Sequence, residues 1–125
     1  MQLDPLPFAK LMGVTVVSVS PDLVVGELKV REELCTRPNV LHGGAYMAFA
    51  DTIGAVATVA NLKEGEGTTT IESKTNFFAA IPLGDTARAE CTALHKGRST
   101  MVWQTKITRG DGKLCAVVTQ TQMVL

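Results

Sequence analysis

One segment of this chain, residues 43–62, constrains the possible fold more than any other. It follows His42 directly and carries six alanines between positions 45 and 60, with apolar residues on all of its sides. The pattern predicts a single long helix, and a helix that is apolar all round is normally buried. The rest of the chain is therefore expected to be arranged around this helix.

Asp51 is the one charged residue in this segment. A buried carboxylate without a partner is costly, so Asp51 must be paired from elsewhere, protonated, or retained for chemistry. Gly43 and Gly44 stand at the start of the same segment. Their bare backbone N–H groups would face whatever lies at the mouth of the helix, and such a mouth suits an anion or a polarised carbonyl.

Gly43 and Asp51 are too far apart to act together within one helix. Eight residues at a rise of 1.5 Å separate them by roughly 12 Å. We therefore hypothesise that the site is shared between subunits, with Gly43 of one chain facing Asp51 of the partner subunit. Two such helices would run antiparallel across a two-fold axis and create two equivalent sites. This hypothesis requires at least a dimer.

Length and charge limit the class of protein. The chain has 125 residues, of which 46% are hydrophobic, so residues 1–125 are predicted to form one domain with one core. Twelve basic and twelve acidic residues cancel. The absence of a net positive charge argues against general nucleic-acid binding.

The cysteines and the N-terminal sequence indicate a compartment. An odd number of cysteines, three, with no paired spacing argues for a reducing environment. The first residues lack the basic-then-apolar pattern of a signal peptide. Strands are expected directly after residues 43–62, and Asp51 lies inside that segment, so we interpret it as a core helix rather than a membrane span. The predicted location is the cytoplasm, without a membrane partner.

The remaining pattern predicts strands joined by short turns. A short helix is expected over residues 4–13, capped by Asp4, with Pro5 at its first position and Gly13 at its end. Alternating or β-branched runs predict strands at residues 14–20, 23–30, 69–77, 87–93, 101–107 and 115–125, and residues 31–41 are expected to form a loop. Short turns favour antiparallel pairing. The fold class is therefore α+β, with an antiparallel sheet of five or six strands wrapped around one long central helix.

The motif around His42 resembles that of a known family. Residues 40–45, Val-Leu-His-Gly-Gly-Ala, with an acid nine residues after the histidine, are similar to the hotdog-fold acyl-CoA thioesterases, and most of all to the phenylacetyl-CoA and 4-hydroxybenzoyl-CoA thioesterase group. Residues 76–78, 82–85, 94–98 and 111–114 also resemble family segments, in the expected order. The resemblance covers nearly the whole chain.

The resemblance implies a homodimer, often paired into a homotetramer, that hydrolyses an aryl- or medium-chain acyl-CoA thioester at sites between subunits, without a cofactor or metal. Gly43 would donate its N–H to the thioester carbonyl. Asp51 would act as a general base for water or as a nucleophile, and the sequence does not choose between these. His42 is expected to orient the N-terminal end of the central helix rather than transfer a proton.

Some positions depart from the family pattern. Relatives often have Gln or Asn in the loop before the motif, whereas this loop offers Thr36, Arg37 and Asn39 with no clean match. Ala55 replaces a hydroxyl residue, and residues 79–80 replace Arg-Pro. The missing arginine leaves Lys74, Lys96 or Arg98 to contact the CoA phosphates. The candidate substrate-binding residues are Thr36, Asn39, Gly44, Ala55, Asn76, Phe77, Phe78, Lys96 and Arg98.

Other interpretations stay open at this point. A non-catalytic acyl-CoA binding or sensing domain could share the fold, and so could a hydratase or dehydratase, although that chemistry pairs an acid with a histidine. Cys35 and His42 could form a thiol–imidazole pair, although a packed thiol is favoured. The histidines and cysteines have no metal-ligand spacing. An apolar acyl pocket is expected from Met47, Phe49, Ile53, Phe77 and Phe78, without identifying the acyl group.

Overall fold

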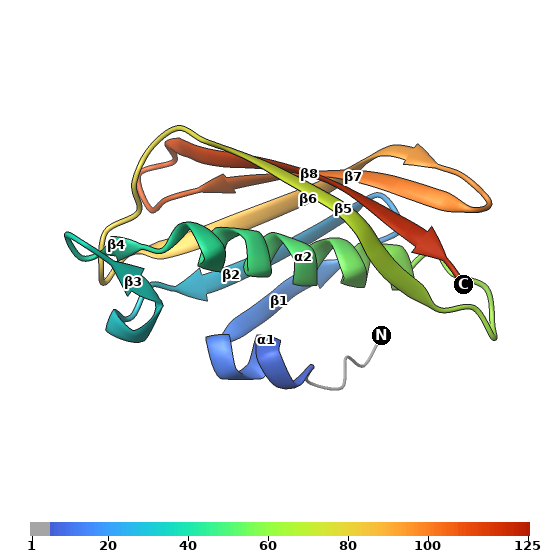
Figure 1. Ribbon diagram of the computed structural model, residues 1–125, viewed down its shortest axis with the longest axis horizontal. Coiled ribbons are helices and arrows are strands. Elements are labelled where there is room, and N and C mark those ends of the chain that lie inside the picture. Colours follow the sequence, from blue (N-terminus) through green and yellow to red (C-terminus); the bar gives the residue numbers. More distant parts are fainter. Residues whose placement is uncertain (1–5) are drawn as a thin grey trace.

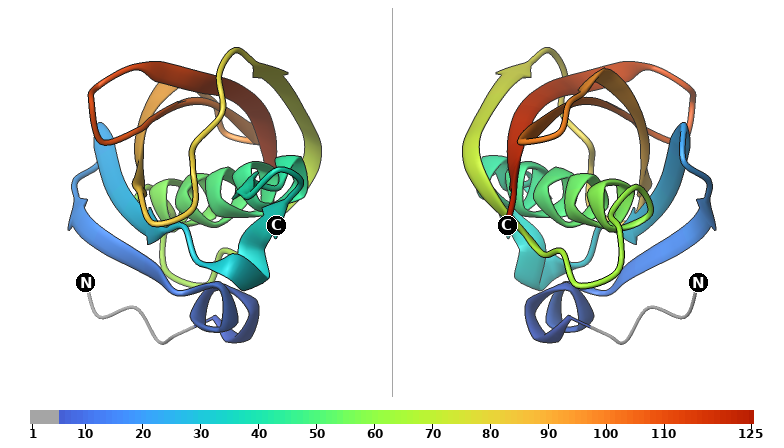
Figure 2. Two further views of the ribbon diagram at one scale, coloured as in Figure 1. Left: turned by 90° about the vertical axis from the view of Figure 1, so that its left-hand side faces the viewer. Right: turned by 90° about the vertical axis from the view of Figure 1, so that its right-hand side faces the viewer.

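The computed structural model describes residues 6–125 and shows a six-stranded antiparallel sheet curled around one long helix (Figures 1 and 2). The elements are α1 (Pro7–Met12), β1 (Val14–Val19), β2 (Leu23–Lys29), the 3₁₀ turn η1 (Glu32–Leu34), β3 (Cys35–Thr36), β4 (Val40–Leu41), α2 (Gly43–Val59), β5 (Thr68–Phe77), β6 (Thr86–Lys96), β7 (Thr100–Thr108) and β8 (Leu114–Val124). This architecture is the predicted α+β arrangement.

The sheet has the strand order β1-β2-β6-β7-β8-β5, and every neighbouring pair is antiparallel. The strand that follows α2, β5, therefore lies at the edge of the sheet beside the last strand, β8. The segment expected to be a loop contains a small separate ladder, β3 with β4. Seen end-on in Figure 2, the sheet covers α2 on one side, and α1 lies outside the sheet, across the open side of the curl.

The short helix α1 ends where the sequence predicts. Gly13 adopts the left-handed conformation at φ 87°, and its N–H donates to the carbonyls of Ala9 and Lys10. Glycine is suited to this position because it has no Cβ. The predicted cap, Asp4, and the predicted first residue, Pro5, lie outside the described residues.

Small residues on the inner face of the sheet allow α2 to approach closely. Ala87, Ala89 and Cys91 on β6 are fully buried. On β2, a Cβ added to Gly26 would lie 2.4 Å from Cδ1 of Ile53 on the helix, so any larger residue there would force the Ile53 side chain to move. The helix therefore packs tightly onto the concave face of the sheet.

Two side chains anchor the C-terminal half of α2 to the rest of the fold. The indole N–H of Trp103 on β7 donates to Oγ1 of Thr58 at 2.9 Å, and Thr58 in turn donates to the carbonyl of Gly54. The Asn61 amide donates to the carbonyls of Ala57 and Pro21, which ties the end of the helix to the β1–β2 turn. The helix ends at Val59, three residues before the predicted limit.

The expectation that α2 is buried on all sides holds only for the side that faces the sheet. Phe49, Ala50 and Ile53 are fully buried there. On the opposite side, which we call the uncovered side, the residues are half-buried or exposed and mostly small. They are Gly44, Ala45, Ala48, Asp51, Thr52, Ala55 and Val59. Among the described helices, none is long and apolar enough to cross a membrane.

Candidate active site

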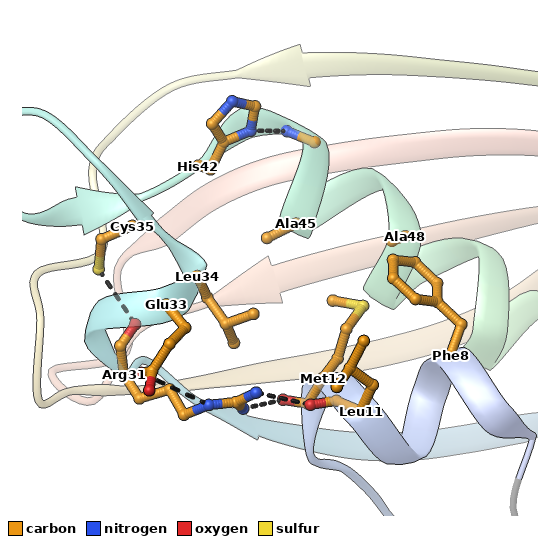
Figure 3. A pocket seen from close by; sticks show the side chains of 11 residues that line it. Phe8, Leu11, Met12, Arg31, Glu33, Leu34, Cys35, His42, Ala45 and Ala48 are labelled. Carbon is orange, nitrogen blue, oxygen red and sulfur yellow. Dashed lines mark hydrogen bonds and ion pairs between the residues drawn. The ribbon is translucent and has the colours of Figure 1, made fainter.

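His42 caps the start of α2 and occupies one of the two glycine N–H groups. Its Nδ1 accepts a hydrogen bond from the N–H of Gly44 at 2.8 Å (Figure 3). Within residues 6–125, the N–H of Gly43 has no acceptor. The sequence predicted an open mouth with both glycines free, whereas the structure leaves Gly43 as the available donor. A free N–H in the first turn of a helix favours a negatively charged or polarised group.

An aromatic ring, that of Phe77, lies beside Gly43. A Cβ added to Gly43 would lie 3.4 Å from Cζ of Phe77, at the end of β5. The Phe77 ring meets Tyr46 edge to face, with the ring centroids 5.3 Å apart, and the Tyr46 hydroxyl donates to the carbonyl of Ala79. Burial raises the pKa of Tyr46, so this phenol remains a neutral donor. The free N–H of Gly43 therefore has a half-exposed aromatic ring beside it.

Asp51 is half-buried and is held by two neutral donors rather than by a cation. Its Oδ1 accepts from the Thr70 hydroxyl at 2.6 Å and from the Gln120 amide at 3.3 Å. In the part of the chain that the structure describes, Oδ2 has no donor and the carboxylate has no ion-pair partner. One oxygen is therefore fixed in place by hydrogen bonds, and the other has none from the described residues.

A second set of hydrogen bonds fixes the direction of the Thr70 hydroxyl. The Gln122 amide nitrogen donates to Thr70 Oγ1 at 2.6 Å, and the Thr68 hydroxyl donates to Gln122 Oε1 at 3.0 Å. Because an amide N–H can only donate, the Thr70 hydroxyl must point its own hydrogen at Asp51. Sequence reasoning missed these residues. The available signal was the pair of glutamines at inward-facing positions of β8, where both side chains are almost fully buried.

The position of Gln120 depends on a glycine in α2. A Cβ added to Gly54 would lie 2.3 Å from Cδ of Gln120. Gly54 is therefore the residue that lets the amide reach Asp51. In one protomer, Asp51 and Gly43 remain eight residues apart along a continuous helix, roughly 12 Å, so a single chain does not bring them together.

A family model described as the thioesterase superfamily matches residues 38–116, which include the helix mouth, Asp51 and Thr70. This chain belongs to the thioesterase superfamily. The match confirms the resemblance noted in the sequence.

Three proteins similar to this chain support the same assignment. A 1,4-dihydroxy-2-naphthoyl-CoA hydrolase of Listeria monocytogenes is 32% identical over 107 residues, 85% of each chain. The proofreading thioesterase EntH of Cronobacter sakazakii is 27% identical over 104 residues, 83% of this chain and 75% of EntH. The crystal structure of a thioesterase from Haemophilus influenzae matches with a TM-score of 0.89 at 28% identity, covering 94% of this chain and 82% of that chain. The fold is therefore the hotdog fold of these enzymes.

The other residues predicted to bind substrate lie in three regions of the structure. Thr36 is the last residue of β3 and Asn39 lies in the turn that leads to β4, before the helix mouth, and the N–H of Asn39 donates to the carbonyl of Thr36. Asn76 and Phe77 are the last residues of β5 and Phe78 follows them, and of the three it is Phe77 that lies next to Gly43. Ala55 is on the uncovered side of α2, one turn beyond Asp51.

Lys96 and Arg98 form the third region, in the β6–β7 turn at the far end of α2 from Gly43. Together with Asn61 and Lys63 they line a pocket of about 380 Å³. Lys96 is already engaged, because its ammonium group donates to the carbonyl of Pro21 and pairs with Asp22 at 2.9 Å. Within one chain, these basic residues do not lie near the helix mouth.

One expectation about side chains is wrong, and one alternative left open by the sequence does not occur. Phe49 and Ile53 are fully buried in the core and cannot line an acyl pocket. Cys35 Sγ contacts the carbonyl of Arg31 at 3.4 Å, while His42 caps the helix, so the two do not form a thiol–imidazole pair (Figure 3). Among the described residues, no three His, Cys, Asp or Glu side chains cluster as metal ligands would.

Proposed function

We propose that this protein is an acyl-CoA thioesterase, which hydrolyses an aryl- or medium-chain acyl-CoA to the free acid and CoA. The observation that carries the proposal is the state of Asp51. Its carboxylate has one oxygen fixed by Thr70 and Gln120 and the other free, and it lies on the uncovered side of the helix that presents the free N–H of Gly43.

Gly43 supplies the polarising group in this proposal. Its N–H would donate to the thioester carbonyl oxygen and stabilise the negative charge that develops there during attack. One such donor is typically worth ~10²–10³ in kcat. His42 would act by holding the Gly44 N–H and so fixing the first turn of α2.

Asp51 drives the attack through Oδ2. As a general base, it takes a proton from water while the water oxygen bonds to the carbonyl carbon, and the C–S bond then breaks to release CoA thiolate. As a nucleophile, Oδ2 itself bonds to the carbonyl carbon, CoA leaves, and water hydrolyses the resulting anhydride. Both routes give the same products, and both require an ionised carboxylate.

The proposed active unit is a homodimer, in which Gly43 of one subunit faces Asp51 of the partner subunit. The separation of the two groups in one chain supports this arrangement, and so does the small size of Ala55, one turn beyond Asp51, which allows a second helix to approach closely. An antiparallel pair of helices would also bring Arg98 at the far end of α2 toward the partner's helix mouth. There it could contact a CoA phosphate.

The reaction and its carboxylate are tested by thiol release from a panel of aryl- and alkyl-CoA thioesters. We expect Asp51→Asn to lower kcat by at least ~10² while the dimer persists in sedimentation, and the exposed control Glu64→Gln to retain activity. Cys35 is a half-buried free thiol, so the dye signal without substrate must be subtracted. Near-normal turnover in Asp51→Asn would reject the assignment. Ligand binding without turnover in the wild type would favour a binding or sensing domain.

The shared site has its own test. Gly43 is the first residue of α2 and His42 is extended, so Gly43→Pro removes the N–H at a position where proline is well tolerated. Gly43→Pro and Asp51→Asn chains should each be inactive alone. Mixed dimers then contain one intact site, so co-expression should restore about a quarter of wild-type activity. No restoration, with mixed dimers verified by mass, would show that each chain builds its own site.

A further inference from the structure

A pocket of about 550 Å³ lies between α1, the segment of residues 31–35 and the uncovered side of α2 (Figure 3). The size falls within the range of about 300–1,000 Å³ that is typical of small-molecule sites. The residues that give it its apolar lining are Phe8, Leu11, Met12, Leu34, Ala45 and Ala48. This pocket differs from the one expected from the sequence, because its lining contains none of the five residues expected there, Met47, Phe49, Ile53, Phe77 and Phe78.

The pocket is continuous with the helix mouth. His42 and Gly44 line it as well as forming the cap of α2. Ala45 and Ala48 follow along the same side of the helix, and their small side chains leave the space open. Gly43 itself does not line the pocket, but both of its neighbours in the sequence do, so a group bound in the pocket would lie next to a carbonyl held at the first turn of α2.

The wall formed by α1 is apolar and incompletely covered. Phe8 and Leu11 expose 60% and 68% of their surface, although such side chains gain free energy when buried. Figure 3 shows the Phe8 ring on the side of the pocket nearest Ala48. An apolar ligand between α1 and α2 would cover these side chains.

The charged residues at the rim do not offer a free charge to a ligand. The Arg31 guanidinium donates to the carbonyls of Leu11 and Met12 at the C-terminal end of α1, where a cation is favoured, and it also pairs with Glu33 at 3.8 Å. Arg31 therefore holds α1 in place. With both charges engaged, the lining suits an uncharged group and not a carboxylate.

We propose that the pocket between α1 and α2 binds the acyl group of the thioester, that this group is an uncharged alkyl or aryl group, and that Phe8 and Ala48 set its size. The inference rests on the proposed function for the position of the carbonyl at Gly43. It adds the place where the acyl group binds, the exclusion of a charged acyl group, and the two residues that select its size.

The turnover test compares kcat/KM for acetyl-, butyryl-, hexanoyl-, octanoyl-, phenylacetyl- and succinyl-CoA. Ala48→Leu places a larger side chain in the pocket, and Phe8→Ala removes its aromatic wall. Each should lower the preference for octanoyl- over acetyl-CoA by ~10-fold or more. Leu94→Ala, an exposed leucine on β6 outside the pocket, should keep the wild-type profile. Wild-type protein should prefer butyryl- to succinyl-CoA, and the reverse would overturn the inference.

A binding test separates this inference from the proposed function. Calorimetry with the thioethers S-methyl-CoA and S-octyl-CoA measures the gain in affinity from the alkyl chain without any turnover. We expect a gain in the wild type and in Leu94→Ala, and a loss of most of it in Ala48→Leu and Phe8→Ala. If the wild type hydrolyses nothing but shows this pattern, the proposed function fails and the pocket stands.

Three results would overturn the pocket assignment. The first is that the wild type is active, but both variants keep its chain-length preference in kcat/KM and its gain in affinity from S-methyl-CoA to S-octyl-CoA. The second is the absence of any alkyl gain in the wild type. The third is that Ala48→Leu and Phe8→Ala both become monomeric while their chain-length preference in kcat/KM stays that of the wild type. That result would show that a second copy of the chain, and not an acyl group, fills the space.

Discussion

The two sides of α2 differ in the size and in the burial of their residues. The side facing the sheet carries Phe49 and Ile53, both fully buried, together with Thr58, whose hydroxyl accepts the Trp103 indole N–H. The uncovered side carries small residues, with Asp51 at its border with β5 and β8. Stability is therefore concentrated on one side, and the groups available for chemistry on the other. An alanine-rich helix can serve both purposes because small side chains leave room for a ligand or a second subunit.

The largest effect on stability is expected from the side facing the sheet. Phe49→Ala should lower the free energy of unfolding by about 3–5 kcal/mol, because it leaves a cavity in the core. On the uncovered side, Val59→Ala should change it by about 0.5 kcal/mol or less, since Val59 is 44% exposed. Urea denaturation followed by Trp103 fluorescence measures both. A large loss in Val59→Ala that depends on protein concentration would break the comparison and show that a partner covers this side.

A smaller effect is expected from the polar contact that anchors α2. Thr58→Val keeps the side-chain shape but leaves the buried Trp103 N–H without its acceptor, which should cost about 1–3 kcal/mol. Thr58→Ser retains the hydroxyl and should recover most of that loss. Urea midpoints for the three proteins decide the point. Equal stability of the valine and serine variants would mean that this hydrogen bond does not hold the helix.

The smallest effect concerns Thr70, and it should appear in catalysis. Thr70→Val removes the donor to Asp51 Oδ1 and should lower kcat/KM about tenfold, whereas Thr70→Ser should restore it. A positioning role should appear in kcat, with KM and the urea midpoint of Thr70→Val close to the wild-type values. A fall in the urea midpoint with kcat unchanged would therefore count against Thr70 as a positioning residue.

Local sequence patterns were sufficient for the two α-helices and the six strands of the main sheet, but not for η1 and the β3–β4 ladder. The alternation along β5 to β8 and the apolar run after Gly43 depend on neighbouring residues, and these elements occur where they were predicted. Gly13 likewise ends α1 through its own backbone conformation. The prediction that α2 is buried on every side failed, because the alanine-rich run is apolar all round and does not show which side faces the sheet.

Contacts between distant segments were not predictable in the same way. Thr70 and Gln120 reach Asp51 from strands 19 and 69 residues away in the sequence. Their pairing depends on the strand order, which places β5 beside β8. Lys96 and Arg98 follow the family segments in sequence order, but that order does not reveal that the β6–β7 turn lies at the opposite end of α2 from Gly43.

The attachment of α1 has a consequence for how such an enzyme could diverge. This helix lies outside the sheet and is held at its C-terminal end by the Arg31 guanidinium. Substitutions at Phe8 or Leu11 therefore alter one wall of the pocket without disturbing the buried residues that maintain the fold. New acyl preferences can arise through a few changes near the N-terminus, while the core and the groups around Asp51 are inherited unchanged.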